Sequence, residues 1–274
     1  MTAVRLLVAD VDGTLVTQEK LLTKRAIAAV ARLHDAGIAL VLTSGRPPRG
    51  MAMLVEPLRL TTPVAAFNGG LVVEPDLVTV RSQHTLPRDV AGEVTAFLLE
   101  AGVDVWLYRG ADWFVRDGNA PHVDRERRTV QFAPKVVADI GSVLDDAVKI
   151  VGVSDDAPRL EKCESELRAR VGHRASAARS QPYYLDVTHP DANKGMVVRE
   201  CSRVLGVPFE AIAAIGDMPN DVLMFAIAGT SIAMGNASPE VQRTARFVTT
   251  SNEEEGFANA VERFILGAGT AVQA

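Results

Sequence analysis

The sequence predicts an α/β protein: a Rossmann-like, doubly wound parallel-sheet core with an inserted α+β domain. Three observations support this fold class. Short apolar runs alternate with helical patterns toward both ends of the 274-residue chain, as in βαβ units. Polar residues directly follow several of these runs, which is typical of the carboxyl edge of such a sheet. Between about 84 and 187 the pattern changes to short alternating stretches that hold both tryptophans and all three tyrosines.

The composition is that of an ordinary globular protein and excludes several classes of function. The chain is 47% hydrophobic and 23% charged, and its net charge of -5 indicates neither nucleic acid nor a membrane surface as partner. No apolar run approaches the roughly 18 residues of a membrane span. The first run is interrupted by Asp10 and Asp12, unlike a secretory signal. Cys163 and Cys201 form no CxxC pair. We therefore expect a cytoplasmic protein.

The first part of the chain predicts three strands separated by helices. The apolar run at 4–9 predicts the first strand, and Thr23 is placed to cap a helix that runs to about Ala36. Apolar runs at 38–42 and 63–67 predict the second and third strands. Two further elements are a short helix that begins at Pro47 and Pro48 and a hairpin over 71–81.

We expect the core at 1–83 and 188–274, interrupted by the inserted domain at 84–187. The expected elements of the insert are helices over 88–101 and 159–171 and strands over 103–108, 113–116 and 148–153. Where the core resumes, we expect helices over 194–205, 222–228 and 256–266, and strands over 211–215, 231–234 and 247–249.

The end of the first strand carries two carboxylates. Asp10 and Asp12 are two positions apart, so their side chains point the same way in an extended segment. Two such carboxylates repel each other and need a cation or a proton nearby. Gly13 permits a sharp turn after them. An Asp-Gly pair also occurs in ordinary turns, so this motif needs support from the rest of the chain.

Other strand ends supply that support. Ser44 follows the second strand, where its hydroxyl fits both a donor to an anion and a helix N-cap. Lys194 opens a helix, whose positive end favours phosphate, although most lysines are solvated surface residues. Asp217 ends another strand, and Asn220 and Asp221 follow, although residues of this kind also cap helices. Oxygen ligands that converge there favour Mg²⁺.

Four motifs follow one another along the chain: Asp10-Val11-Asp12-Gly13-Thr14, Ser44-Gly45-Arg46, Lys194-Gly195 and Gly216-Asp217-Met218-Pro219-Asn220-Asp221. As an ordered set they resemble the phosphohydrolases of the haloacid dehalogenase superfamily. Asn68-Gly69-Gly70 and Asn252-Glu253-Glu254-Glu255-Gly256 look like its Cof-type branch (subclass IIB), in which a large cap domain is inserted late in the core.

The resemblance implies a role for each matching residue. Asp10 would be the nucleophile, and Asp12 the general acid and then the general base. Ser44 and Lys194 would hold the phosphoryl oxygens. The implied metal set is Asp10, Asp12 through its backbone carbonyl, Asp217, Asn220 and Asp221. The implied substrate-binding set is Thr14, Gly45, Arg46, Asn68 and Gly69.

The implied function is a Mg²⁺-dependent phosphatase that hydrolyses a small phosphorylated metabolite, such as a sugar phosphate, through an aspartyl-phosphate. The cap would select the substrate, although interior packing explains its aromatic residues better than substrate contact does. A phosphotransferase or phosphomutase would use the same intermediate. A third alternative is a non-enzymatic, phospho-regulated binding protein, but receiver-like modules of that kind are shorter and lack an insert. No feature of the sequence indicates an oligomeric state.

Overall fold

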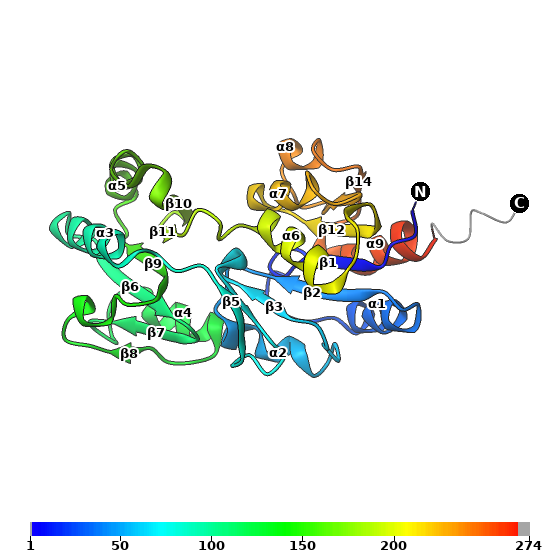
Figure 1. Ribbon diagram of the computed structural model, residues 1–274, viewed down its shortest axis with the longest axis horizontal. Helices are drawn as coiled ribbons and strands as arrows, with labels where there is room; N and C mark the ends of the chain where they lie inside the picture. Colours follow the sequence, from blue (N-terminus) through cyan, green and yellow to red (C-terminus); the bar gives the residue numbers. More distant parts are fainter. Residues whose placement is uncertain (1, 268–274) are drawn as a thin grey trace, which may run out of the picture. The chain divides into compact units, whose positions relative to one another are not determined.

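The computed structural model describes residues 2–267, which form two compact units (Figure 1). The first unit comprises the described residues of Met1–Gly45, Ala52–Gly69 and Asn193–Ala274. The second comprises Arg46–Met51 and Gly70–Ala192. The predicted fold class, an α/β protein built on a parallel sheet, is confirmed. The domain boundaries expected at 84 and 187 stay a prediction. The second compact unit is larger than the expected insert, because it also contains residues 46–51 and the 71–83 hairpin.

The first unit is built on a parallel sheet. Its strands are β1 (Leu6–Asp10), β2 (Ala39–Thr43), β3 (Val64–Ala66), β12 (Ile212–Gly216), β13 (Thr230–Ala233) and β14 (Phe247–Val248). They follow the order β14-β13-β12-β1-β2-β3, so β1 lies between the early β2 and the late β12. The residues of β1 and β12 are buried throughout, as expected for a parallel sheet covered on both faces.

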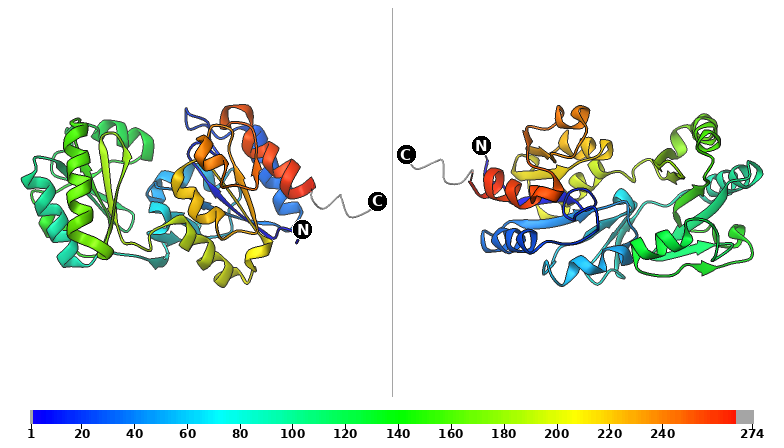
Figure 2. Two further views of the ribbon diagram at one scale, coloured as in Figure 1. Left: turned by 90° about the horizontal axis from the view of Figure 1, so that it is seen from above. Right: turned by 180° about the vertical axis from the view of Figure 1, so that it is seen from behind.

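Helices cover both faces of this sheet. They are α1 (Lys24–Asp35), α2 (Ala52–Val55), α6 (Lys194–Leu205), α7 (Val222–Phe225), α8 (Pro239–Gln242) and α9 (Gly256–Ala260), which continues as a π-helix over Val261–Leu266. Figure 2 shows α1 (blue) and α9 (red) on one side of the sheet and α6 (olive) on the other. The strands and helices therefore form the doubly wound layers that the sequence predicts.

Local capping sets where two important helices begin. The Thr23 hydroxyl accepts a hydrogen bond from the backbone N–H of Ala26 at 3.0 Å and starts α1, as predicted. The Asn193 side chain accepts from the backbone N–H of Met196 at 3.1 Å and starts α6. Gly206 ends α6 in the left-handed conformation, so the helix expected over 194–205 is confirmed.

The second unit has a six-stranded sheet, antiparallel except for one parallel edge pair, and a hairpin outside that sheet. The strands of this unit are β4 (Leu71–Val73), β5 (Val80–Gln83), β6 (Asp104–Arg109), β7 (Asp112–Val115), β8 (Lys135–Val136), β9 (Ala147–Val153), β10 (Ser176–Gln181) and β11 (Tyr184–Thr188). The sheet order is β10-β11-β9-β6-β7-β8, while β4 and β5 form the predicted hairpin. Its helices are α3 (Arg88–Glu100), α4 (Val123–Val130) and α5 (Ala157–Val171).

The two faces of this second sheet differ in chemistry. One face packs apolar side chains such as Val105, Leu107 and Ile150 with α3 and α5 in a hydrophobic core. Trp106, Tyr108 and other aromatic residues lie at alternate positions and belong to the opposite face. This aromatic face is near α4, because the Tyr108 hydroxyl donates to Glu126 at 3.1 Å.

Several expectations need adjustment. The helix expected from Pro47 is a 3₁₀ turn over Pro48–Met51 followed by the four-residue α2, which ends where the chain turns at 56–59. The sequence pattern did not predict α4 or the edge strand β10, both of which are mostly polar. Cys163 and Cys201 are both buried free thiols. Within residues 2–267, no helix is both long and apolar enough to cross a membrane.

Candidate active site

Four charged side chains meet at the carboxyl edge of the parallel sheet. Asp10 ends β1, Asp217 follows β12, Asp221 lies one turn later, and Lys194 begins α6. All four are buried. Carboxylate oxygens of Asp10, Asp217 and Asp221 lie within 4.8 Å of one another. The structure therefore brings together predicted site residues from distant parts of the chain, at the edge where α/β proteins bind ligands.

Lys194 is the cation of this group. Its ammonium donates hydrogen bonds to Oδ1 of Asp10 and, at 2.5 Å, to Oδ1 of Asp221. The residue is only 2% exposed, which excludes a solvated surface lysine. Burial lowers the pKa of Lys194, but the charges of Asp10 and Asp221 outweigh burial and raise the pKa above its usual value. Lys194 therefore keeps its positive charge next to Asp10.

One lysine does not neutralise three carboxylates. Burial raises the pKa of Asp10 well above its usual range, and the charges of Asp221 and Asp217 raise it further, while Lys194 lowers it. Burial, followed by the charge of Asp221, raises the pKa of Asp217 to about 6. A site with surplus buried carboxylate oxygens fits a hard divalent cation, which would let these groups ionise at neutral pH.

Two glycines let backbone approach these carboxylates. Gly13 has a φ of +81°, and a Cβ added there would collide with the carboxylate of Asp217. A Cβ at Gly216 would collide with the carboxylate of Asp221. Glycine is thus needed at both positions because the side chains opposite fill the space of any larger residue.

Asp221 and Thr14 hold the loop and side chain of Asp217. Oδ2 of Asp221 accepts hydrogen bonds from the backbone N–H groups of Asp217 and Met218, each at 2.8 Å. The Thr14 hydroxyl donates to Oδ1 of Asp217 at 3.1 Å. Asp221 therefore connects Lys194 to the loop that carries Asp217. Thr14, which was predicted to bind substrate, contacts the Asp217 carboxylate.

Asn236 also contacts the charged cluster, although the sequence motifs do not include it. Its side-chain N–H group donates to the Gly13 carbonyl at 2.9 Å and to Oδ2 of Asp217 at 3.2 Å. Its Oδ1 accepts from the backbone N–H of Asn252 at 3.0 Å. Asn236 comes shortly after β13, so the rule that polar residues follow strand ends also applies to it. Asn236 links the loops after β1 and β12.

The remaining core positions lie around this cluster. The carboxylate of Asp12 forms an ion pair with Lys20 at 2.8 Å and lies outside the group of three acids. The Asn220 amide donates to Oδ1 of Asn68 at 3.2 Å. Asn68 itself has a φ of 57°, in the left-handed region. The metal-binding role of Asp12 and Asn220 and the substrate-binding role of Asn68 stay predictions.

The loop after β2 contains three further predicted residues. Ser44 is buried, and its carbonyl accepts from the backbone N–H of Asn68 at 2.7 Å. The expected N-cap role of Ser44 is wrong, because the 3₁₀ turn begins four residues later, at Pro48. Arg46 donates to the Gly50 carbonyl at 3.0 Å and so braces the loop, while its substrate-binding role stays a prediction. Gly45 and Gly69 belong to the first unit, and their substrate-binding roles stay predictions.

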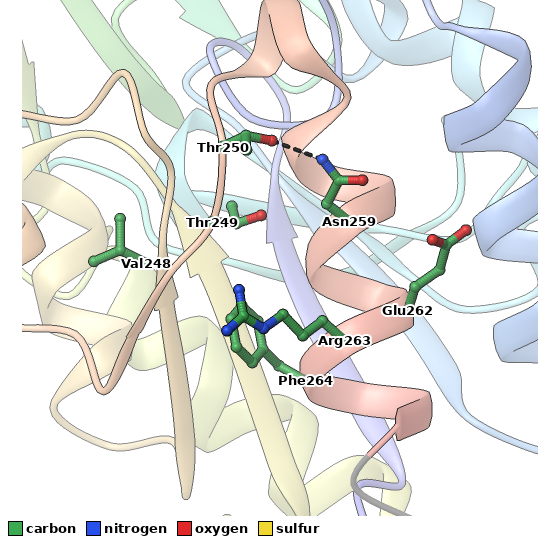
Figure 3. Close-up of a pocket in the computed structure, with 7 residues that line it drawn as sticks. All are labelled: Val248, Thr249, Thr250, Asn259, Glu262, Arg263 and Phe264. Carbon is green, nitrogen blue, oxygen red and sulfur yellow. Dashed lines mark hydrogen bonds between the residues drawn. The ribbon is translucent and has the colours of Figure 1, made fainter.

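A surface pocket of the first unit lies away from these residues. Figure 3 shows its lining, which comes from the segment that includes β14 and from α9 and the π-helix. The Asn259 amide donates to the Thr250 hydroxyl at 2.8 Å, and Glu262 pairs with Arg25 of α1 at 2.9 Å. These polar groups connect elements of the first unit, and none of the lining residues belongs to the predicted site.

The sequence profile of the haloacid dehalogenase-like hydrolases matches residues 7–261. The chain belongs to this family. A 5-amino-6-(5-phospho-D-ribitylamino)uracil phosphatase of Bacillus subtilis is 30% identical over 272 residues, 94% of this chain and 97% of the relative. A pyridoxal phosphate phosphatase of Escherichia coli is 27% identical, over 96% of this chain and 99% of the relative.

Solved structures agree with this assignment. A haloacid dehalogenase-like hydrolase from Bacteroides thetaiotaomicron has a TM-score of 0.88 and 30% identity, and the match covers 95% of this chain and 99% of that one. The predicted resemblance to Cof-type phosphatases of the superfamily is confirmed, as is the prediction of a phosphoric monoester hydrolase. Hydrolases of this family typically use a divalent metal, and the acidic cluster is able to bind one.

Proposed function

We propose that this haloacid dehalogenase-like hydrolase is a Mg²⁺-dependent phosphatase that forms an aspartyl-phosphate on Asp10. Its substrate would be a small phosphate monoester. The observation that carries the proposal is the buried contact between Asp10 and Lys194, beside Asp217 and Asp221. A phosphate group needs a nucleophile and positive charge at the same place, and this contact supplies both.

The proposed reaction has two displacements. In the first, a carboxylate oxygen of Asp10 attacks phosphorus, the ester P–O bond breaks, and Asp12 gives its proton to the leaving alkoxide. In the second, Asp12 takes a proton from water, the water oxygen attacks phosphorus, and the bond to Asp10 breaks. The Asp10 carboxylate and free phosphate are the products, so Asp10 and Asp12 return to their initial states.

Lys194 and Ser44 would stabilise the phosphoryl oxygens during both steps. The raised pKa of Asp10 means that its nucleophilic carboxylate form needs nearby positive charge, which Lys194 provides in part. Held by Asp10, Asp217 and the backbone carbonyl of Asp12, Mg²⁺ would supply further positive charge for both the carboxylates and the phosphoryl oxygens.

Phosphate release from a panel of monoesters tests the proposal. The panel includes sugar phosphates, nucleotides, pyridoxal phosphate and phosphorylated ribityl compounds, each with Mg²⁺ and with EDTA. We expect Mg²⁺-dependent release from a few members. Release of the alcohol without an equal amount of phosphate, in the presence of an acceptor alcohol, would instead support the phosphotransferase alternative. A folded protein that processes no member would contradict the proposal.

Mg²⁺ should stabilise the protein more at neutral than at acidic pH. Because the folded-state pKa values of Asp10 and Asp217 are raised, their protonated forms stabilise the fold below about pH 4. This contribution is lost as the pH rises through about 6, the pKa of Asp217. Saturating Mg²⁺ should therefore raise Tm by about 5 °C at neutral pH and by less than half of that at pH 5.

Thermal unfolding with Mg²⁺ or EDTA at both pH values measures this difference. The Asp217→Asn variant should show a smaller Mg²⁺-induced rise at neutral pH, whereas Asp35→Asn, at an exposed position of α1, should behave as the unmodified protein does. An equal Mg²⁺-induced rise at both pH values would contradict binding by these carboxylates.

We also infer that the aromatic face of the second unit selects the organic part of the substrate. Buried polar atoms without a hydrogen-bond partner collect there, namely Nε1 of Trp106, Nε1 of Trp113, the Tyr184 hydroxyl and Oδ1 of Asp186. Lys149 pairs with the other carboxylate oxygen of Asp186 at 2.6 Å. Buried donors and acceptors without partners are costly, and a polar ligand rich in hydroxyl groups would satisfy them.

The Tyr184→Phe variant tests this inference. Removing a buried hydroxyl that has no partner should leave the free energy of unfolding unchanged or raise it by about 1 kcal/mol. If that hydroxyl binds substrate, KM for the best panel member should rise about 3- to 10-fold while kcat stays nearly constant. Tyr183→Phe is the matched control. An unchanged KM in Tyr184→Phe would exclude the hydroxyl from substrate binding.

A further inference from the structure

A second cluster of metal-ligating side chains lies in the second unit. His84 follows β5, whereas His189 and Asp191 follow β11. One nitrogen of each histidine and one carboxylate oxygen of Asp191 lie within 4.8 Å of one another. The two imidazole rings are stacked, with centroids 5.4 Å apart and an angle of 21° between their planes. Two segments distant in sequence therefore place three potential ligands side by side.

The donor set distinguishes this cluster from the one around Asp10. Two imidazole nitrogens and one carboxylate oxygen suit a zinc-class divalent ion, whereas the three carboxylates of the first unit suit a hard ion such as Mg²⁺. Among the described residues, Asp191 has no ion pair with a lysine or arginine, so its charge is not already neutralised in that way.

The histidine geometry suits coordination of a cation, because the stacked rings hold one nitrogen of each histidine near the other and near Asp191. The backbone N–H of Asp191 donates to Nδ1 of His189 at 3.1 Å, so Nδ1 presents a lone pair rather than a proton. A metal ion would replace this hydrogen bond with a coordinate bond. The side chains of His189 and Asp191 are 30% and 55% exposed, which leaves water free to complete the coordination.

We propose that His84, His189 and Asp191 form a binding site for a zinc-class divalent transition metal, separate from the candidate active site. His84 is the first residue of the expected insert, 84–187, and His189 lies two residues after its end. A metal ion bound by both would close that long loop and stabilise the second unit, because a site absent from the unfolded chain adds its binding free energy to folding.

Cobalt titration of the full-length protein tests the site directly. Excess Mg²⁺ is present throughout to fill the carboxylate cluster, and Co²⁺ serves as the spectroscopic probe. We expect one equivalent of Co²⁺ to give the visible absorption of a nitrogen-containing site of low coordination number, and Zn²⁺ to displace it. Zn²⁺ should also raise Tm. Neither readout depends on phosphatase activity, so this proposal and the proposed function fail independently.

Substitution of the ligands completes the test. His84→Gln and His189→Gln should each lose the cobalt band and bind Zn²⁺ at least about 10-fold more weakly. His173→Gln, an exposed histidine of the same unit, is the control and should keep both. If a histidine variant does not fold, Asp191→Asn at an exposed position provides the same comparison. Absence of the cobalt band in the unmodified protein, or its persistence in these ligand variants, would overturn the proposal.

Discussion

Asp10→Asn is expected to abolish phosphate release, with a loss of at least about 10⁴-fold in kcat. An amide oxygen does not attack phosphorus as a carboxylate does, so the first displacement stops. The fold should remain, because asparagine has the same shape and removes one of three crowded carboxylates while Lys194 keeps its ion pair with Asp221. Steady-state phosphate release and thermal unfolding together measure both parts of this prediction.

Chemical trapping separates a nucleophile from a residue that only positions the substrate. Quenched during turnover of a phosphorus-labelled substrate, the unmodified enzyme should carry a phosphoryl group that hydroxylamine removes, and Asp10→Asn should carry none. Asp35→Asn serves as the matched control on an exposed helix face. Near-native turnover by Asp10→Asn would refute nucleophilic catalysis by this residue.

Lys194→Met is expected to damage both stability and catalysis. Without the ammonium group, Asp10 and Asp221 remain buried with no cation between them, which should cost about 3–5 kcal/mol of folding free energy in EDTA. Catalysis should fall by at least about 10³-fold in kcat/KM, because positive charge on the phosphoryl oxygens is lost. Urea unfolding and substrate turnover measure the two effects.

Mg²⁺ distinguishes these two roles of the lysine. In the Lys194→Met variant, added Mg²⁺ should restore part of the lost folding stability by neutralising the carboxylates of the cluster. Added Mg²⁺ should not restore turnover. Lys24→Met, an exposed position at the start of α1, should change neither property appreciably. Turnover close to that of the unmodified enzyme in Lys194→Met would show that the lysine serves stability alone.

The sequence predicts the core well because local rules and tertiary structure agree there. Continuous apolar runs identify β1, β2 and β12, and polar residues at strand ends identify Asp10 and Asp217. Lys194 was predicted from its place at the start of a helix, and its burial between two carboxylates confirms that it is not a surface lysine. The residues that form the charged cluster can therefore be predicted from the order of apolar runs and polar strand ends in the sequence.

Other features depend on contacts that pattern does not contain. Asn236 follows a strand, as the other site residues do, but nothing local indicates that its amide reaches the Gly13 carbonyl. The helix α4 has only two apolar residues, Val123 and Val130, one at each end, which are too few for a helical period to be recognised in the sequence. The pairing of His84 with His189 depends on segments that only the folded second unit brings together.

The position of β1 has a consequence for synthesis on the ribosome. β2 emerges soon after β1, but the other neighbour, β12, emerges only after the entire second unit has been translated. Until then the nascent chain presents an unpaired apolar strand edge, a surface at which chains aggregate. We therefore expect a higher yield of native enzyme from chaperones that shield this edge, or from slower growth at low temperature during expression. Substitutions on the surface of the folded protein should increase the yield less.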